Sequence, residues 1–301
     1  MLEVDHIRKE FGSVRAVRDI SFAIQPGTTF GLLGPNGAGK TTTMRMILGI
    51  VETDGGRIAW QGKPVDGKMR RRCGYLPEER GLYAKMKVRE QIHYFGRLHG
   101  LTEPKITQRT DAWIERLGLQ DYALRPCSEL SKGNQQKVQM ACAAVHEPEL
   151  LILDEPFSGL DPVNADMLLM VLSDLKARGA TLVLSSHQMW QLEELCTSFC
   201  IIAGGATKTS GTLEQLRAAW PTRVIRVAPN SSAVCAVLGA VPGARSLGNA
   251  QSDGAVDYEV PAATELPPIL RRLVEADAIT RFEAIEPSLH DIYIRAIEET
   301  K

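Results

Sequence analysis

Over the first two thirds of the chain, short runs of apolar residues alternate with segments whose apolar positions recur every three or four residues. A short apolar run bounded by polar residues is typical of a strand that is buried on both faces. Such strands are predicted at residues 29–33, 150–153, 181–185 and 199–203. The helical segments between them would cover both faces of one sheet. We therefore expect an α/β fold with a mostly parallel sheet up to about residue 215.

Two segments of this region follow other patterns. Residues 2–27 indicate antiparallel strands that end in a Pro-Gly turn, so we expect an antiparallel β subdomain here. Residues 88–100 and 103–118 have helical periodicity, and each segment stops at a glycine, which commonly ends a helix. These two segments predict a helical subdomain over about residues 85–145.

The composition changes near Trp220, where "AAWPTRVIRVAP" introduces a second domain. Its pattern predicts strand 223–228, helix 231–240, strand 244–248, strand 255–260, helix 265–276 and strand 279–285. This βαββαβ order is the split-βαβ, or ferredoxin-like, arrangement. Ser288 would cap a last helix, whose apolar face comprises Leu289, Ile292, Tyr293 and Ile297. We place the α/β domain at residues 1–215 and a small α+β domain at residues 222–301.

Composition and charge narrow the class of protein. A chain of 301 residues with 44% hydrophobic and 24% charged residues is an ordinary globular protein long enough for two domains. A net charge of −1 gives no reason to expect nucleic-acid binding, and the basic run from Lys68 to Arg72 is interpreted as solvated surface. The six cysteines include no CxxC pair, which indicates free thiols in a reducing cytosol. We find no signal-peptide pattern and no apolar run approaching ~18 residues, so this chain is not expected to cross a membrane.

A phosphate-binding loop follows the first buried strand. The stretch "GPNGAGKT" fits the pattern G-x-x-x-x-G-K-[ST] at Gly34, Gly39, Lys40 and Thr41, and an amphipathic helix follows it. Glycines at these positions let successive backbone N–H groups surround a phosphate, while Lys40 reaches the β- and γ-phosphate oxygens. The hydroxyl group of Thr41 would ligate Mg²⁺.

Two acidic residues end the strand "LLIL". Asp154 is placed at the carboxyl edge of the sheet, where α/β proteins hold ligand groups, and is expected to bind the Mg²⁺ through water. The adjacent Glu155 points elsewhere and can polarise an attacking water. Adjacent acids at a strand end are often only a solvated turn, but the phosphate-binding loop favours the functional interpretation. His187 follows the next buried strand along the chain and could contact the γ-phosphate, although a lone histidine there is more often structural.

A second anion site is predicted at "LSKGNQQ". Ser131 can cap the helix that follows, and Gly133 leaves the backbone N–H groups of the first turn accessible at the positive end of the helix dipole. This site has no lysine or metal-binding acid of its own. It is therefore interpreted as one half of a composite site.

Together these motifs resemble the nucleotide-binding subunit of an ATP-binding cassette (ABC) transporter. The resemblance covers residues 1–215 and comprises Walker A "GPNGAGKT", Walker B "LLILDE", the D-loop "SGLD" ending at Asp161, the switch histidine His187 and the signature "LSKGNQQ". It implies a P-loop NTPase fold, an ABC cassette with the antiparallel β and helical subdomains, that hydrolyses ATP with Mg²⁺. The family stacks an aromatic ring on adenine at the position of Phe11, which the pattern alone would assign to the core.

The resemblance also implies a role for each matching position. Glu155 and His187 would be the catalytic residues. Thr41, Glu78 and Asp154 would bind the metal. The nucleotide-binding residues would be Phe11, Gly34, Pro35, Asn36, Gly37, Ala38, Gly39, Lys40, Thr41 and Thr42. The signature residues would be Ser131, Lys132, Gly133 and Asn134, with Asp161 in the D-loop.

Three positions depart from the usual family pattern. Lys132 and Asn134 replace Gly and Gln in the signature, whereas Ser131 and Gly133 are kept. Glu78 stands where many relatives have the Q-loop glutamine, and adds a negative charge beside the phosphates while still able to ligate Mg²⁺ or align water. The stretches "GYLPEERGLY", "LSKGNQQK" and "EPSLHDIYI" are similar to the ABC-2-type exporter branch, which includes members assigned to sodium or drug efflux. Members of that branch carry a similar extra C-terminal domain, to which we assign no role beyond dimer or partner contact.

In the family, two such subunits enclose two ATP molecules head to tail, and each signature helix caps the γ-phosphate held by the other subunit. The resemblance therefore implies a second ATP-binding subunit, expected to be another copy of this chain, although a heterodimer is left open. It also implies a separate transmembrane permease, with this chain in the cytoplasm as a peripheral protein on the inner face of the cell membrane. The transported substrate is chosen by the permease in this family.

Two alternatives were weighed. A soluble ABC ATPase that acts on nucleic acid or ribosomes usually carries two cassettes in one chain, or long inserts between the Q-loop and the signature. This chain has a single Walker A motif and about fifty residues between Glu78 and Ser131, so no nucleic-acid partner is expected. A nucleotide-binding regulatory module without turnover is disfavoured by the presence of Glu155.

Overall fold

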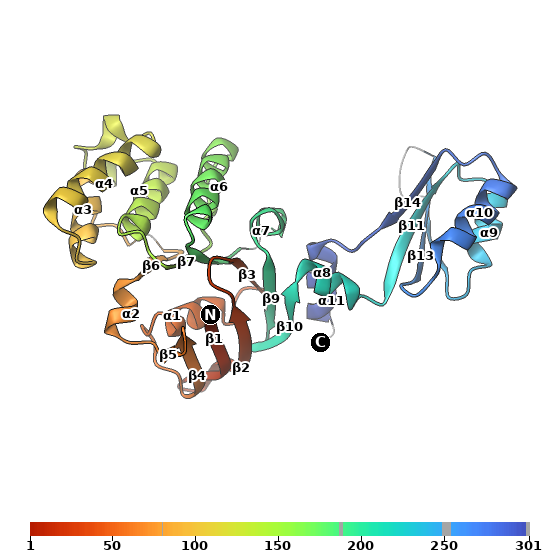
Figure 1. Cartoon of the computed structure of the whole chain (residues 1–301), viewed down its shortest axis with the longest axis horizontal. Helices are drawn as coiled ribbons and strands as arrows, with labels where there is room; N and C mark the ends of the chain where they lie inside the picture. The colour runs from red at the N-terminus through yellow and green to blue at the C-terminus, as the bar shows by residue number, and fades with distance from the viewer. Residues whose placement is uncertain (80, 187–188, 249–253, 299–301) are drawn as a thin grey trace. The chain divides into compact units, whose positions relative to one another are not determined.

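The computed structural model describes residues 1–79, 81–186, 189–248 and 254–298. Its backbone contacts divide the chain into two units. The first unit is Met1–Thr212 together with the described end of the chain from Ala296, and the second unit is Leu213–Arg295 (Figure 1). Each unit is described by itself below.

The first unit is built on one mixed sheet. Among the described residues it has ten strands in the order β5-β4-β1-β2-β10-β9-β3-β8-β7-β6. The strands are β1 (Leu2–Phe11), β2 (Val14–Ile24), β3 (Thr29–Leu33), β4 (Gly55–Trp60), β5 (Lys63–Pro64), β6 (Cys73–Leu76), β7 (Leu150–Asp154), β8 (Thr181–Ser185), β9 (Ser198–Ala203) and β10 (Ala206–Thr212). Strands β9, β3, β8, β7 and β6 run parallel, whereas β1 pairs antiparallel with β2 and β4. The predicted parallel core and the predicted antiparallel subdomain are both confirmed.

Helices of the first unit fall into two groups (Figure 1). One group contacts the strands and includes α1 (Lys40–Ile47), α2 (Gly67–Arg71) and α6 (Pro162–Ala177), while α7 (Met189–Leu195) connects β8 to β9. The other group packs helix on helix and consists of α3 (Val88–Leu98), α4 (Glu103–Arg116) and α5 (Lys132–Ala144), of which α5 also contacts β6. Two short 3₁₀ helices, η1 (Gln120–Tyr122) and η2 (Cys127–Glu129), connect α4 to α5.

The apolar core holds the start of α1 in place. Met44 and Ile47 of this helix are fully buried in a cluster with side chains of β1, β2, β3 and β7. Within that cluster the rings of Phe22 and Phe30 stack with their centroids 4.9 Å apart. Burying a side chain of this size stabilises the fold by about 1.5–3 kcal/mol. The loop between β3 and α1 is therefore anchored at both ends by packed elements.

The second unit has a four-stranded antiparallel sheet in the order β12-β13-β11-β14. Its strands are β11 (Thr222–Ala228), β12 (Arg245–Gly248), β13 (Val256–Pro261) and β14 (Arg281–Ile285). Its helices are α8 (Leu213–Ala218), α9 (Ser232–Gly239), α10 (Leu266–Ala276) and the part of α11 (Leu289–Glu298) up to Arg295. Ile225, Val227, Val234, Leu238 and Leu273 form a fully buried core between the sheet and helices α9 and α10. From β11 to β14 the elements follow the predicted βαββαβ order.

Ser288 caps the last helix as expected. Its hydroxyl group accepts a hydrogen bond from the backbone N–H of Asp291 at 3.2 Å, and the Asp291 carboxylate accepts one from the backbone N–H of Ser288 at 2.8 Å. This reciprocal pair satisfies backbone donors that a helix start leaves without partners.

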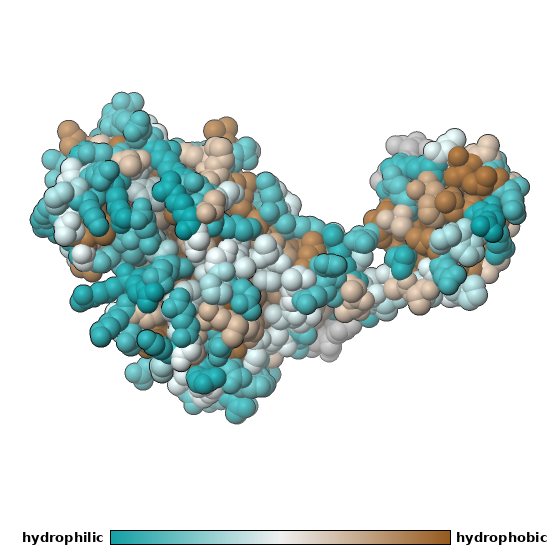
Figure 2. All heavy atoms as spheres, viewed as in Figure 1, coloured by the Kyte–Doolittle hydropathy of each residue, from teal (hydrophilic) through white to brown (hydrophobic). Residues whose placement is uncertain are grey.

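The surface is mixed in polarity. On the face shown in Figure 2, hydrophilic residues cover much of the surface. Hydrophobic residues gather on the second unit near α9 and α10, where Leu270 and Val274 are exposed. Within the described part of the chain, no helix has both the length and the apolar character needed to span a bilayer.

Candidate active site

The phosphate-binding loop joins β3 to α1 and depends on glycine at two places. A Cβ atom on Gly34 would lie 2.4 Å from the backbone oxygen of Ile202, and one on Gly39 would lie 2.6 Å from that of Ala16. Gly39 also has a φ of 103°, which a larger residue rarely adopts. The close approach of neighbouring strands therefore requires these two residues to be glycine.

Lys40, the first residue of α1, turns back over the loop that precedes it. Its side-chain amine donates hydrogen bonds to the backbone oxygens of Gly34 at 2.7 Å and Pro35 at 3.2 Å. The side chain is buried, so the cation is held at a defined place beside the backbone N–H groups of the loop. A cation beside a set of N–H donors is suited to bind a polyphosphate.

A cavity of about 440 Å³ lies beside this loop. Its volume is within the range of small-molecule sites. Residues from four segments line it: Val14, Arg15, Ala16, Asn36, Gly37, Ala38, Gly39, Lys40, Thr41, Thr42, Glu78, Asp154 and Glu155. The fold thus brings the predicted loop, the two acids after β7 and Glu78 to one cavity.

Phe11 ends β1 outside the lining of this cavity and is 50% exposed. The amine of Lys9 lies 5.5 Å from the centre of its ring. An exposed ring is available for stacking, and this position does not belong to the core that the pattern alone would have assigned.

Asp154 ends β7 with a carboxylate that is only 1% exposed. Its Oδ1 atom accepts a hydrogen bond from the hydroxyl group of Ser185 at 2.6 Å, and its Oδ2 atom is buried without a partner among the described residues. Leaving a buried charged oxygen without a donor is costly, whereas a metal ion or its bound water would satisfy it. The donor set of this cavity therefore fits Mg²⁺.

Glu155 follows directly and turns the chain sharply. Its φ of 50° is left-handed, a conformation that costs a non-glycine residue on the order of 1 kcal/mol or more. The backbone N–H of Glu155 donates to the same Ser185 hydroxyl group at 3.0 Å, which holds the turn in place. The side chain is 8% exposed and lines the cavity. Local backbone strain of this kind is characteristic of functional sites.

Glu78 lies after β6 and is exposed at the edge of the cavity. Gln139 of α5 holds the backbone on both sides of it, because its side-chain amide donates to the backbone oxygens of Pro77 and Glu79, each at 3.2 Å. Gln136, one turn earlier on α5, donates to the backbone oxygen of Pro156 at 2.8 Å. The helix that carries the signature is thus connected to the segments that carry Glu78 and Glu155.

The signature residues lie elsewhere on the first unit. Ser131 caps α5 by accepting the backbone N–H of Asn134 at 3.3 Å. Asp161 caps α6 by accepting the backbone N–H of Asn164 at 3.0 Å, and this hydrogen bond lowers the pKa of the Asp161 carboxyl. A Cβ atom on Gly133 would lie 3.2 Å from the side-chain nitrogen of Asn164, so the signature and the D-loop meet at that residue.

None of the four predicted signature residues lines the cavity of the same chain. His187, predicted to contact the γ-phosphate, lies outside the described residues. Ser185, Gln136 and Gln139 were not predicted as site residues, because a serine at a strand end and polar residues on a helix are common in any protein. Their importance follows from distances between segments far apart in the chain.

A parallel sheet that brings a glycine-rich loop with a lysine to two acids at a neighbouring strand end defines a P-loop nucleoside triphosphatase. Comparison with known proteins narrows this class. Residues 17–158 match the ABC transporter family, and residues 211–297 match the ATP-binding protein DrrA1-3-like C-terminal domain.

Individual proteins are similar over long stretches. The uncharacterized ABC transporter ATP-binding protein YhaQ of Bacillus subtilis (strain 168) is 42% identical over 297 residues, which cover 99% of this chain and 98% of YhaQ. The Nod factor export ATP-binding protein I of Paraburkholderia xenovorans (strain LB400) is 38% identical over 213 residues, 70% of each chain. A solved structure of an ATP binding subunit of an ABC transporter aligns with a TM-score of 0.68 at 34% identity, and covers 72% of this chain and 92% of that one.

The chain belongs to the family of ABC transporter ATP-binding proteins. It is an ABC ATPase subunit that binds and hydrolyses ATP, with the cassette fold of its family followed by a smaller antiparallel-sheet domain. The alternative of an ATPase that acts on nucleic acid receives no support from these relatives.

Proposed function

We propose that this chain drives an ABC exporter as one of two identical ATPase subunits, which close head to tail around two molecules of ATP and Mg²⁺. The observation that carries the proposal is that two half-sites on one chain are each incomplete. The cavity at Lys40, Asp154 and Glu155 contains no signature residue, and the helix start at Ser131 has no lysine or metal-binding acid. A second copy supplies what each half-site lacks.

In the proposed site, the backbone N–H groups of residues 36–41 and the amine of Lys40 bind the β- and γ-phosphates of ATP. The hydroxyl group of Thr41, the Oδ2 atom of Asp154 and the carboxylate of Glu78 would hold Mg²⁺, directly or through water. When bound there, the ion would supply positive charge beside the phosphate oxygens. The ring of Phe11, exposed at the end of β1, stacks on the adenine.

Glu155 orients the attacking water and accepts its proton while the oxygen approaches the γ-phosphorus. The backbone turns in a left-handed conformation at Glu155, directly after Asp154, and both acids line the cavity. In the proposed mechanism Asp154 serves the metal and Glu155 serves the water. The partner chain contributes its Ser131 hydroxyl group, the backbone of its residues 132–134 and the positive end of α5 to the γ-phosphate. Asp161, close to the signature through Asn164, would lie at the contact between the two chains.

A groove beside Glu78 is the proposed docking site for the permease. It has a volume of about 310 Å³, and its apolar lining includes Leu48, Ile50, Tyr75, Pro77, Leu82 and Phe95. The proposed occupant is a short cytoplasmic helix of a transmembrane permease, since this chain belongs to a transporter family and none of its described helices can span a bilayer. Pro77 lines the groove, and its backbone oxygen accepts the hydrogen bond from Gln139. Docking of the permease helix would therefore shift the backbone of the adjacent Glu78.

Export, as the direction of transport, is supported by the similar protein that is named for Nod factor export. Bound to its permease, the chain would be a peripheral protein on the cytoplasmic face of the cell membrane.

Mixing two inactive variants tests the composite site. Glu155→Gln leaves phosphate binding intact and should lower turnover by roughly 10²–10⁴-fold, because the water loses its base. Ser131→Arg places a bulky cation where the partner's γ-phosphate would bind. In a mixed dimer one site carries both changes and the other carries neither. With free exchange about half of the dimers are mixed, so about a quarter of all sites are intact and ATPase activity should return up to that fraction.

Subunit exchange is verified with two fluorescent labels on the same preparations. Lys40→Ala mixed with Glu155→Gln is the matched control, because both changes lie in the same half-site and each mixed dimer still lacks an intact site. No recovery of activity with proven exchange would contradict the shared site. Full activity of either single variant would contradict the role assigned to its residue.

A further inference from the structure

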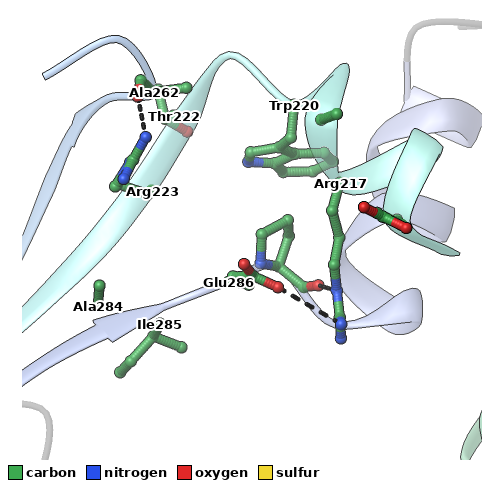
Figure 3. Close-up of a pocket in the computed structure, with 11 residues that line it drawn as sticks. Arg217, Trp220, Thr222, Arg223, Ala262, Ala284, Ile285 and Glu286 are labelled. Atoms are coloured by element: carbon green, nitrogen blue, oxygen red, sulfur yellow. Dashed lines mark hydrogen bonds and ion pairs between the residues drawn. The ribbon is translucent and has the colours of Figure 1, made fainter.

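The second unit has a cavity of its own, of about 460 Å³, that belongs to neither half of the ATP site. It lies where α8 leads into β11 and β14 leaves the sheet (Figure 3). Its lining comprises Glu214, Arg217, Ala218, Trp220, Thr222, Arg223, Ala262, Ala284, Ile285, Glu286 and Pro287. Arginines, an indole ring and short apolar side chains are combined here in a volume typical of small-molecule sites.

Arg223 is the unusual residue of this cavity. Strand alternation puts it on the face of β11 that carries Ile225 and Val227, both of which are fully buried. Its guanidinium group donates to the backbone oxygen of Ala262, and among the described residues no carboxylate pairs with it. A partly buried guanidinium group that is held by a neutral acceptor keeps further N–H donors for an anion.

Trp220 forms a second wall. The guanidinium group of Arg295 lies 4.9 Å from the centre of its ring, which holds the indole in one orientation. Figure 3 shows this ring between Arg223 on one side and the Arg217–Glu286 pair on the other. The indole N–H has no hydrogen-bond partner among the described residues, so it can donate to a ligand that stacks against or abuts the ring.

Arg217 is already engaged on the opposite wall. It donates to the backbone oxygen of Pro287 at 2.9 Å and lies 3.5 Å from the carboxylate of Glu286. The charge of Arg217 is therefore largely balanced by Glu286. The remaining acid of the lining, Glu214, is exposed to solvent, where its charge is screened. Arg223 is thus left as the cation that lacks a counterion inside the cavity.

We propose that this cavity binds a small organic anion: a carboxylate attached to a planar apolar body. The carboxylate would pair with Arg223 through two parallel hydrogen bonds, and the apolar body would lie against the indole of Trp220, Ala284 and Ile285. A free inorganic phosphate would leave the apolar walls uncovered, and an organic cation would face the uncompensated charge of Arg223. The second unit is thereby a ligand-binding domain joined to the ATPase.

Fluorine NMR of the full chain tests the proposal with two probes of nearly equal shape. We expect 4-(trifluoromethyl)benzoate to give a saturable change in its ¹⁹F signal, and the neutral 4-(trifluoromethyl)benzyl alcohol to bind at least about tenfold more weakly. Arg223→Gln should weaken benzoate binding by at least about tenfold, because it removes the guanidinium group and leaves a neutral polar side chain. Arg272→Gln, the same change at an exposed position of α10, should bind as the unchanged chain does.

Benzoate could also enter the ATP site, so Lys40→Ala is the control for location and should bind the probe normally. Melting temperatures establish that each variant is folded. The proposal is overturned if the full chain shows no saturable benzoate binding, if the alcohol binds equally well, if Arg223→Gln has no effect, or if Lys40→Ala removes the binding.

Discussion

At the scale of single residues, one hydroxyl group organises both acids of the ATP site. Ser185 donates to Asp154 and accepts the backbone N–H of Glu155, across the pairing of β7 with β8. It thereby fixes the carboxylate that faces the metal site and the turn that redirects the next side chain. The serine itself touches neither phosphate nor water in the proposed mechanism, so its effect is one of positioning.

Ser185→Ala should therefore reduce the ATPase kcat by at least about tenfold while ATP binding changes little, because Lys40 and the loop are untouched. The unpaired oxygen of Asp154 should also cost about 1–3 kcal/mol of stability. Steady-state kinetics and denaturant unfolding measure the two effects. Ser210→Ala is the matched control, since that hydroxyl group donates to the backbone oxygen of Phe199 away from the acids. Equal kcat values for both variants would refute the positioning role.

At the scale of elements, α5 connects the parts of the site. Ser131 and Gly133 at its start belong to the half-site for the partner's phosphate, while Gln136 and Gln139 hold the backbone beside Glu155 and Glu78. A movement of this helix would therefore shift the backbone beside both Glu155 and Glu78, because hydrogen bonds connect them. The helix itself was predicted from "LSKGNQQ", but the partners of its two buried glutamines could not be.

Gln139→Leu should raise the Mg²⁺ concentration needed for half-maximal ATP hydrolysis several-fold, because the backbone around Glu78 loses two hydrogen bonds. Its effect on stability should be small, since the buried Oε1 atom of Gln139 has no partner within the described part of the chain and leucine removes that penalty. Gln135→Leu breaks a hydrogen bond from the same helix to the backbone oxygen of Cys127 and serves as the control. Identical Mg²⁺ dependence in the two variants would show that Gln139 does not act through Glu78.

A stacked histidine pair connects two other elements of the first unit. His99, at the end of α3, and His146, after α5, have ring centroids 3.5 Å apart, and one ring nitrogen of each lies within hydrogen-bond distance of a backbone oxygen, that of Arg71 for His99 and that of Cys73 for His146. Since a carbonyl oxygen only accepts, each of these ring nitrogens is the donor. Burial lowers the pKa of His99, and burial with the nearby His99 lowers the pKa of His146 to about 3. Both rings are therefore neutral near pH 7.

A histidine with a lowered pKa binds fewer protons in the folded chain than in the unfolded chain. The stability that it contributes is complete above about pH 6.5 and is lost progressively as the pH falls towards 3. The melting temperature should thus fall as the pH is lowered from about 7 to 5. The melting temperature of His146→Gln should fall less over this interval. His290→Gln, at an exposed position of α11, should follow the unchanged chain. An equally steep fall in His146→Gln would assign the pH dependence to other groups.

At the scale of the whole molecule, the two units have separate cores and separate cavities. Every residue proposed for ATP binding and hydrolysis lies in the first unit. The match to the ABC transporter family ends at residue 158, and the match to the DrrA1-3-like domain begins at residue 211. The proposed anion cavity lies wholly within residues 214–287.

Deleting residues 222–301 should leave a chain that folds and binds ATP, because its core and its phosphate-binding loop are retained. We expect weaker dimerisation or weaker coupling to the permease, together with loss of benzoate binding. Calorimetry with ATP and sedimentation measure binding and association. An insoluble product, or one without nucleotide affinity, would mean that the second unit completes the fold of the first.

Sequence periodicity alone predicted many of the elements in both units, because a strand buried on two faces and an amphipathic helix each leave a local pattern. Strands β3, β7, β8 and β9 and the βαββαβ order were predicted in this way. The glycine-rich loop could also be predicted from a short stretch of sequence, since its backbone conformation needs glycines within a few positions of one another.

Only the tertiary structure decided which distant residues meet. It placed Ser185 against Asp154, joined Gln139 to the backbone around Glu78 and formed β6, a short strand that no clear pattern marks. It also put Arg223 in a cavity with Trp220, where no carboxylate of the described residues pairs with it, although the pattern of β11 by itself indicates no site. Hydrogen bonds and ion pairs between segments depend on distances that chain closure and packing set, and a one-dimensional pattern contains no such distances.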